Sequence, residues 1–149
     1  MPVSPEFAES NRSQTERLRQ LVRRLDQEKL TLRLPNGWTV AEALAHVAFW
    51  DRQRLCLMRR WAAGENCTGD YAGDVFNDAM LPLLELIPPA LAAAVAVEAA
   101  EEVDAFLLSL PDEVIAAALA RPDKPNLDRG SHREHHLDQI EAALRVAGR

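Results

Sequence analysis

Residues 35–51 read PNGWTVAEALAHVAFWD, and this stretch decides where the principal helix of the chain begins. Its proline and glycine interrupt any preceding helix, because proline lacks a backbone N–H and glycine favours turns. Thr39, followed three residues later by Glu42, forms a capping box in which the two side chains satisfy free backbone N–H groups. The apolar residues after it predict a helix that continues through Trp61 and stops at Gly64.

Outward from this helix, the chain divides into segments separated by proline and glycine, and none has the alternating pattern of a strand. A first helix is expected from about Ser4 or Phe7 to Leu30. The region after the principal helix is broken by a pair of prolines into a short helix near 74–86 and a longer, alanine-rich helix that ends at Leu110.

A loose connection then leads to the last helix, which is expected to run to about Ala147. Ser131, with Glu134 three residues later, forms a second capping box and is the expected cap of this helix. Four principal helices joined by loops of modest length predict an all-α fold, an antiparallel four-helix bundle with a broken third helix region. At 149 residues the chain is expected to form one domain, 1–149.

The composition limits the classes of function. The formal net charge of −6 argues against a nucleic-acid partner, because phosphate binding requires clustered Lys and Arg. No apolar run reaches the length of a membrane span, and the N-terminus does not have the pattern of a secretory signal. Two cysteines do not make a disulfide framework, so a cytoplasmic location is expected.

All four histidines fall at two places in the chain: His46 lies in the quoted stretch, and His132, His135 and His136 lie within five residues of one another. On a helix, His132 and His136 are one turn apart beside the apolar stripe, whereas His135 points to solvent. Two imidazoles one turn apart plus a distant third are ligand geometry for a divalent metal with an open coordination position. The alternatives are a surface cluster at a helix end and a hydrogen-bonded core histidine at position 46.

Several polar residues are candidates to support such a site. Glu42 lies one turn before His46 and is a candidate to be a fourth metal ligand or to orient the imidazole, although capping is the simpler role. Asp51 lies close to an aliphatic stripe, where a carboxylate needs a partner. Asn77 and Asp78 open the broken third region. No rival chemistry is visible, since a glycine-rich phosphate loop, a Gly-x-Ser-x-Gly elbow, a Cys-x-x-Cys pair and a His-Glu-x-x-His motif are all absent.

The quoted stretch resembles the second helix of the DinB-like superfamily, and the end of the chain resembles its last helix through His132-x-x-x-His136-x-x-Gln139-Ile140. The likeness covers most of the chain, because two further segments also fit: Asn77-Asp78 and Leu110-Pro111-Asp112. The resemblance implies a four-helix bundle in which His46, His132 and His136 hold a divalent metal.

Relatives of this kind include mycothiol-dependent maleylpyruvate isomerase and bacillithiol S-transferases, in which the metal is thought to activate a low-molecular-weight thiol. The resemblance therefore implies a metal-dependent thiol transferase or related hydrolase that acts on a small-molecule substrate. Zinc and nickel are the leading metals, with iron and manganese as alternatives. Two other readings stay open: a small-molecule binding or sensor protein that uses the bundle cleft without turnover, and a structural stress-response protein.

The apolar width of the principal helix bears on assembly. Trp50, Leu57 and Trp61 lie outside its main apolar stripe, and this exceeds what one bundle core should need. We therefore expect a homodimer that pairs through helix faces.

Overall fold

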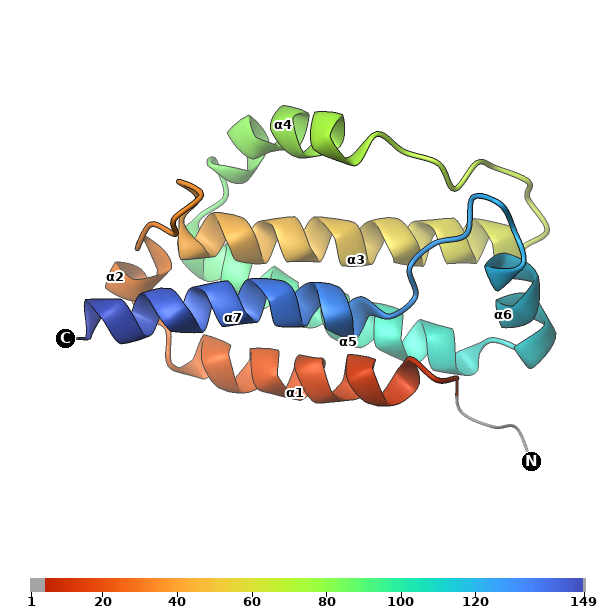
Figure 1. Ribbon diagram of the computed structural model, residues 1–149, viewed down its shortest axis with the longest axis horizontal. Helices are drawn as coiled ribbons and strands as arrows, with labels where there is room; N and C mark the ends of the chain where they lie inside the picture. Colours follow the sequence, from red (N-terminus) through yellow and green to blue (C-terminus); the bar gives the residue numbers. More distant parts are fainter. Residues whose placement is uncertain (1–4, 149) are drawn as a thin grey trace.

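The computed structural model describes residues 5–148, and its long helices lie side by side as a bundle (Figure 1). Three short helices complete the chain, and the only strand-like feature among the described residues is an isolated bridge between Arg33 and Thr39. The all-α bundle with a broken third region is confirmed. The long helices are α1 (Ala8–Arg23), α3 (Val40–Ala62), α5 (Pro89–Ser109) and α7 (Arg129–Ala147), and the short ones are α2 (Gln27–Leu30), α4 (Gly73–Leu84) and α6 (Asp112–Leu119).

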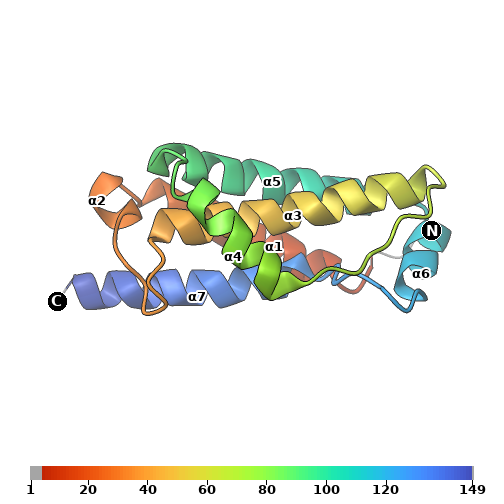
Figure 2. The same ribbon diagram turned by 90° about the horizontal axis from the view of Figure 1, so that it is seen from above.

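The helix directions are mixed. After α3 the chain returns along the outside of the bundle through a loop and α4, so α5 runs parallel to α3 (Figures 1 and 2). Helix α1 runs opposite to α3 and α7 runs opposite to α5, so α1 and α7 are also parallel to each other (Figure 1). Ion pairs join Arg17 of α1 to Asp138 and Glu141 of α7. The antiparallel order expected from short loops holds between α3 and α7 and between α1 and α5.

The start and end of α3 follow the sequence prediction. Thr39 Oγ1 accepts the backbone N–H of Glu42, and Glu42 Oε2 accepts the N–H of Thr39, which completes the capping box. The helix ends before Gly64, whose φ of +87° is a left-handed conformation that a residue with a side chain rarely adopts.

Three predicted boundaries are wrong. The first helix does not reach Leu30, because the Asp26 side chain accepts the N–H of Lys29 and starts the separate helix α2. The loose connection contains α6, which buries Ile115 and Ala118. Helix α7 is capped by Asp128, which accepts the N–H of Ser131, so the expected capping box of Ser131 and Glu134 does not form. Ser4 lies outside the described residues.

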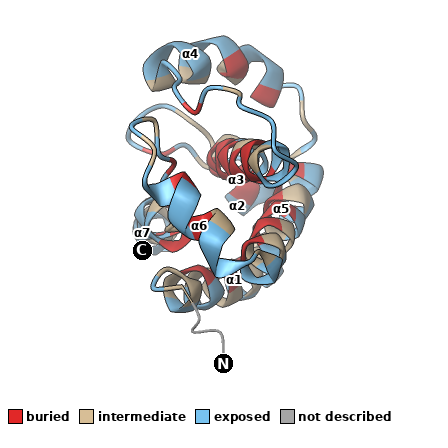
Figure 3. Ribbon diagram, turned by 90° about the vertical axis from the view of Figure 1, so that its right-hand side faces the viewer, coloured by how far each residue is buried: buried red, intermediate tan, exposed pale blue. Residues whose placement is uncertain are grey.

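Buried residues lie mainly on the facing sides of the long helices (Figure 3). Helix α5 contributes mainly alanine to this core, and small side chains allow α3 and α5 to pack closely. None of the described helices combines the length and apolarity that a membrane span requires. The buried alanines of α5 are Ala92, Ala93, Ala96, Ala99 and Ala100.

The core also contains a network of charged side chains that joins all four long helices. Asp51 of α3 is fully buried, and its two carboxylate oxygens accept Nε–H of Arg129 at 2.9 Å and of Arg133 at 3.0 Å. Arg133 also donates to Asp104 of α5 at 2.9 Å and to Thr15 of α1 at 2.9 Å. The partner that a carboxylate at position 51 was expected to need is thus a pair of arginines.

The three side chains behind the homodimer prediction are covered by the same chain. Trp50 is buried and donates Nε1–H to Asn77 of α4. Leu57 is buried, and Trp61 donates to the backbone oxygen of Cys67. The apolar width of α3 is therefore used within one molecule, and the homodimer stays a prediction without this support.

We predict that Asp51→Asn destabilises the fold by about 3–5 kcal/mol, because it leaves two buried guanidinium groups without their shared carboxylate. Asp138→Asn, which removes an exposed partner of Arg17, should cost less than about 1 kcal/mol. Urea denaturation measures both free energies of unfolding, and similar losses in the two variants would contradict a structural role for the buried network.

Candidate metal centre

Three histidines from two helices meet between α3 and α7. The rings of His132 and His136 lie 4.8 Å apart between centroids, and that of His46 lies 5.3 Å and 4.7 Å from them. One nitrogen from each imidazole can be chosen so that all three atoms lie within 4.8 Å of one another. The one-turn spacing on α7 and the antiparallel approach of α3 produce this arrangement.

The hydrogen bonds of the rings fit a metal site in two of three cases. Nδ1 of His46 is buried and has no hydrogen-bond partner among the described residues. His136 Nδ1 lies 3.2 Å from Gln139 Oε1, which can only accept, so the ring proton sits on Nδ1 and Nε2 keeps a free lone pair. A partner of this kind fixes the tautomer and orientation of a metal-binding imidazole.

The third ring has a competing partner. Nη2 of Arg129 lies 3.2 Å from His132 Nδ1, and because a guanidinium only donates, Nδ1 accepts and the ring proton is on Nε2. Binding of a metal by His132 therefore requires that the Arg129 contact be given up, either for the ion at Nδ1 or for the ring proton, whose move from Nε2 to Nδ1 frees Nε2 for the ion. The three nitrogens without a carboxylate are a donor set that suits zinc and nickel.

All three imidazoles are neutral at pH 7. Burial is the main cause of lowered pKa values, to about 3 for His46, about 2 for His132 and about 4 for His136. The positive charge of Arg129 lowers the pKa of His132 and His46 further. Neutral imidazole is the form that binds metal ions. His135 is exposed, as predicted, and lies outside the cluster.

The predicted supporting residues have different surroundings. Glu42 is held in the capping box and makes no hydrogen bond to His46. Asp51 reaches the site only through Arg129, which it holds beside His132. Asp78 is exposed on α4 and lies outside the histidine cluster.

Sequence reasoning missed Arg129 as a neighbour of the site and did not assign Trp38, whose ring lies 4.9 Å from that of His46. Gln139 belonged to the terminal motif but had no role there. A signal was present for two of them: Arg129 precedes His132 by three residues and Gln139 follows His136 by three, and on a helix such pairs are neighbours.

Comparison with protein families gave a match to most of the chain. The family model described as the DinB superfamily matches residues 11–140, which include all three histidines and most of the chain. Neither the curated proteins nor the solved structures gave a match.

The lowered histidine pKa values predict a pH dependence of stability. An unfolded histidine takes up a proton near pH 6.5, whereas buried His46 does so only near pH 3, so its stabilisation is complete above pH 6.5 and is lost as the pH falls. Between pH 6.5 and 5.5, His46 alone should account for a loss of about 1 kcal/mol. Urea denaturation of the metal-free protein at the two pH values should show a loss that is about 1 kcal/mol smaller in His46→Gln. Equal losses in the two proteins would contradict a buried, neutral His46.

Proposed function

The chain belongs to the DinB superfamily, and on that basis we propose that it is a divalent-metal enzyme in which His46, His132 and His136 hold the ion. The observation that carries the proposal is the meeting of three neutral, largely buried imidazoles between two helices. A histidine in such a place normally has a hydrogen-bond partner, and the free Nδ1 of His46 is unusual for a purely structural residue.

The proposed reaction is thiol transfer or a related hydrolysis on a small molecule. An ion held by three neutral ligands keeps its full charge and an open position, and would supply the Lewis acidity that makes a thiol or water nucleophilic near neutral pH. Zinc and nickel suit the three nitrogens best, with iron and manganese as alternatives. Two free cysteines support a reducing compartment, and we propose that the enzyme is cytoplasmic.

The protein side chains would have separate tasks. Gln139 accepts from Nδ1 of His136 and so directs the other ring nitrogen away from itself. Arg129 places a positive charge beside His132, where it would attract an anionic nucleophile. Asp51 holds Arg129 in this position.

We predict that the purified protein carries close to one divalent ion per chain and that His132→Ala and His136→Ala each abolish it. His135→Ala is the matched control and should keep the ion, because this exposed ring lies outside the cluster. Metal content is measured by plasma mass spectrometry after dialysis. Retention of the ion by the His132→Ala, His136→Ala double variant would refute the site. Conjugation of a low-molecular-weight thiol to monochlorobimane then tests turnover, which should follow metal content across the variants.

A separate prediction concerns His46→Gln, which keeps a polar group of similar size. If His46 is a ligand, the variant loses the ion while its circular dichroism spectrum stays helical. If His46 is instead a core histidine, metal content stays normal and the melting temperature falls, because a buried polar group loses its environment at a cost of roughly 1–3 kcal/mol. We expect loss of the ion.

A further inference from the structure

Arg54 of α3 is a buried arginine that forms no ion pair among the described residues. Its exposed fraction is 4%, and its guanidinium donates to two neutral oxygens, Gln53 Oε1 and Tyr71 Oη. Its Nε is buried and has no hydrogen-bond partner within residues 5–148. Burial of a charge without an opposite charge is costly, so such an arginine calls for a specific explanation.

The neighbouring charges do not neutralise Arg54. Both oxygens of Asp51 are taken by Arg129 and Arg133, and Asp104 pairs with Arg133. Three guanidinium groups thus share two carboxylates, and Arg54 is the one that has no carboxylate. Its charge contributes to the low pKa of Arg129 and of His132, which places Arg54 within electrostatic reach of the histidine cluster.

Arg54 is aligned with the proposed metal centre along α3. His46, Trp50 and Arg54 follow one another at four-residue intervals, so they lie on one ridge of the helix and Arg54 is about 12 Å along the axis from His46. Only two buried side-chain nitrogens or oxygens in the described part of the chain have no partner, and they are His46 Nδ1 and Arg54 Nε. Both belong to this ridge.

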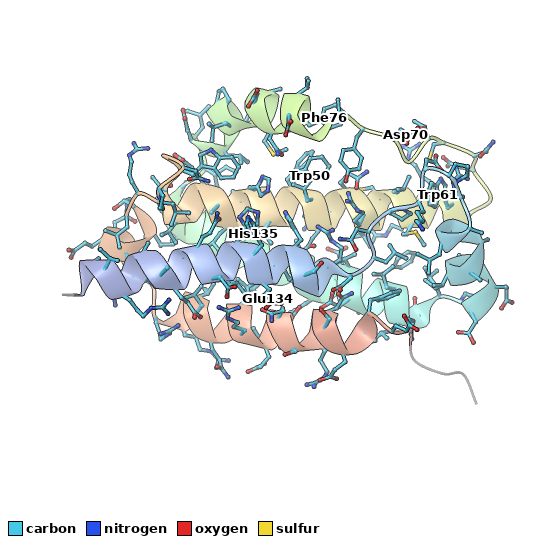
Figure 4. All side chains as sticks on the ribbon, in the orientation of Figure 1. Trp50, Trp61, Asp70, Phe76, Glu134 and His135 are labelled. Atoms are coloured by element: carbon cyan, nitrogen blue, oxygen red, sulfur yellow. The ribbon has the colours of Figure 1, made fainter. Side chains whose placement is uncertain are left out.

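The walls around Arg54 are aromatic. Its guanidinium carbon lies 5.7 Å from the ring centre of Trp50 and 5.0 Å from that of Tyr71. Phe76 stacks on Trp50 at 6.2 Å, and Figure 4 shows these two residues on the side of α3 that faces α4. Tyr71 lies in the loop before α4 and is 41% exposed. The side chain that covers the Arg54 guanidinium is therefore itself at the surface.

We propose that Arg54 binds the carboxylate of a small-molecule ligand whose apolar part lies against Trp50 and points along the ridge toward the three histidines. Nε and Nη2 present a planar, forked pair of donors that matches the two oxygens of a carboxylate. The ligand takes the free Nε and replaces the Tyr71 hydroxyl at Nη2. This inference rests on the proposed function, because it identifies the substrate or the thiol of the metal centre as a carboxylic acid.

Benzoate and benzamide are suitable probes, because they have the same planar body and differ in charge. Calorimetric titration of the metal-free protein should show that benzoate binds at least tenfold more tightly than benzamide. Arg54→Gln should weaken benzoate binding at least tenfold. Arg54→Lys keeps the positive charge but lacks the forked pair of donors, so its affinity for benzoate should lie between those of the wild-type protein and Arg54→Gln. Arg52→Gln is the matched control, since Arg52 pairs with Glu98 and Glu102 on the surface and should leave benzoate binding unchanged.

Tyr71→Phe provides a test that does not remove the buried charge. It frees Nη2 of Arg54, so benzoate should bind at least as tightly as to the wild-type protein, and circular dichroism should show an intact fold. Equal affinity for benzoate and benzamide, or benzoate binding that survives Arg54→Gln, would overturn the inference. Inorganic phosphate that binds more tightly than benzoate would overturn the choice of a carboxylate.

The metal content of the same samples separates this inference from the proposed function. Arg54→Gln should keep one ion per chain, because Arg54 is not among the three histidine ligands. A wild-type protein that binds benzoate through Arg54 but no metal would refute the metal proposal and support the carboxylate site. A protein that binds metal but has equal affinity for benzoate and benzamide would support the metal proposal and refute the carboxylate site.

Discussion

The structure depends on one buried carboxylate, that of Asp51, which is held between Arg129 and Arg133. The two arginines precede His132 and His136 by three residues each, and Asp51 follows His46 by five. A shift of α7 by one turn would separate the carboxylate from one guanidinium inside the core, which costs several kcal/mol. The contact that fixes the register of α7 against α3 therefore also brings the three imidazoles together. Buried ion pairs are weak contributors to net stability, and a register role accounts better for this one.

Arg129, one of these two arginines, affects the electrostatics of the histidine cluster in two opposite ways. Its positive charge, added to burial, lowers the pKa of His46 and His132 and keeps these imidazoles neutral and able to act as ligands. It also repels a cation, and Arg129 occupies a nitrogen of His132. An ion in this centre would have to bind against that repulsion, which an anionic second ligand would relieve. The surrounding charge thus favours a centre that works on anions, although the formal net charge of the whole chain is −6.

The sequence predicted the features that depend on neighbouring residues. The capping box at Thr39, the end of α3 at Gly64 and the inward positions of His132 and His136 each follow from spacing on one helix. Features set by distant contacts were missed. Helix α7 begins at Arg129 because the Asp128 cap is also held by Ser10 of α1, and Gly130 is needed where the α1 backbone at Ser10 lies against it. The parallel direction of α5 depends on the path of the segment that contains α4, which helical periodicity does not reveal.

The buried polar residues of α3 divide into one that the fold explains and two that it does not. This helix is enclosed on most sides and buries mainly apolar side chains, with three polar exceptions: His46, Asp51 and Arg54. Asp51 lies on the face toward α7, and both its oxygens are used, so structure alone explains it. His46 and Arg54 lie on the ridge through Trp50, and each keeps a buried nitrogen that has no partner in the part of the chain that the structure describes. Selection for stability alone would replace such residues with apolar ones, because an unpaired buried polar group costs free energy. The two proposals account for both groups, with the ion at the imidazole of His46 and the carboxylate of the small-molecule ligand at Arg54.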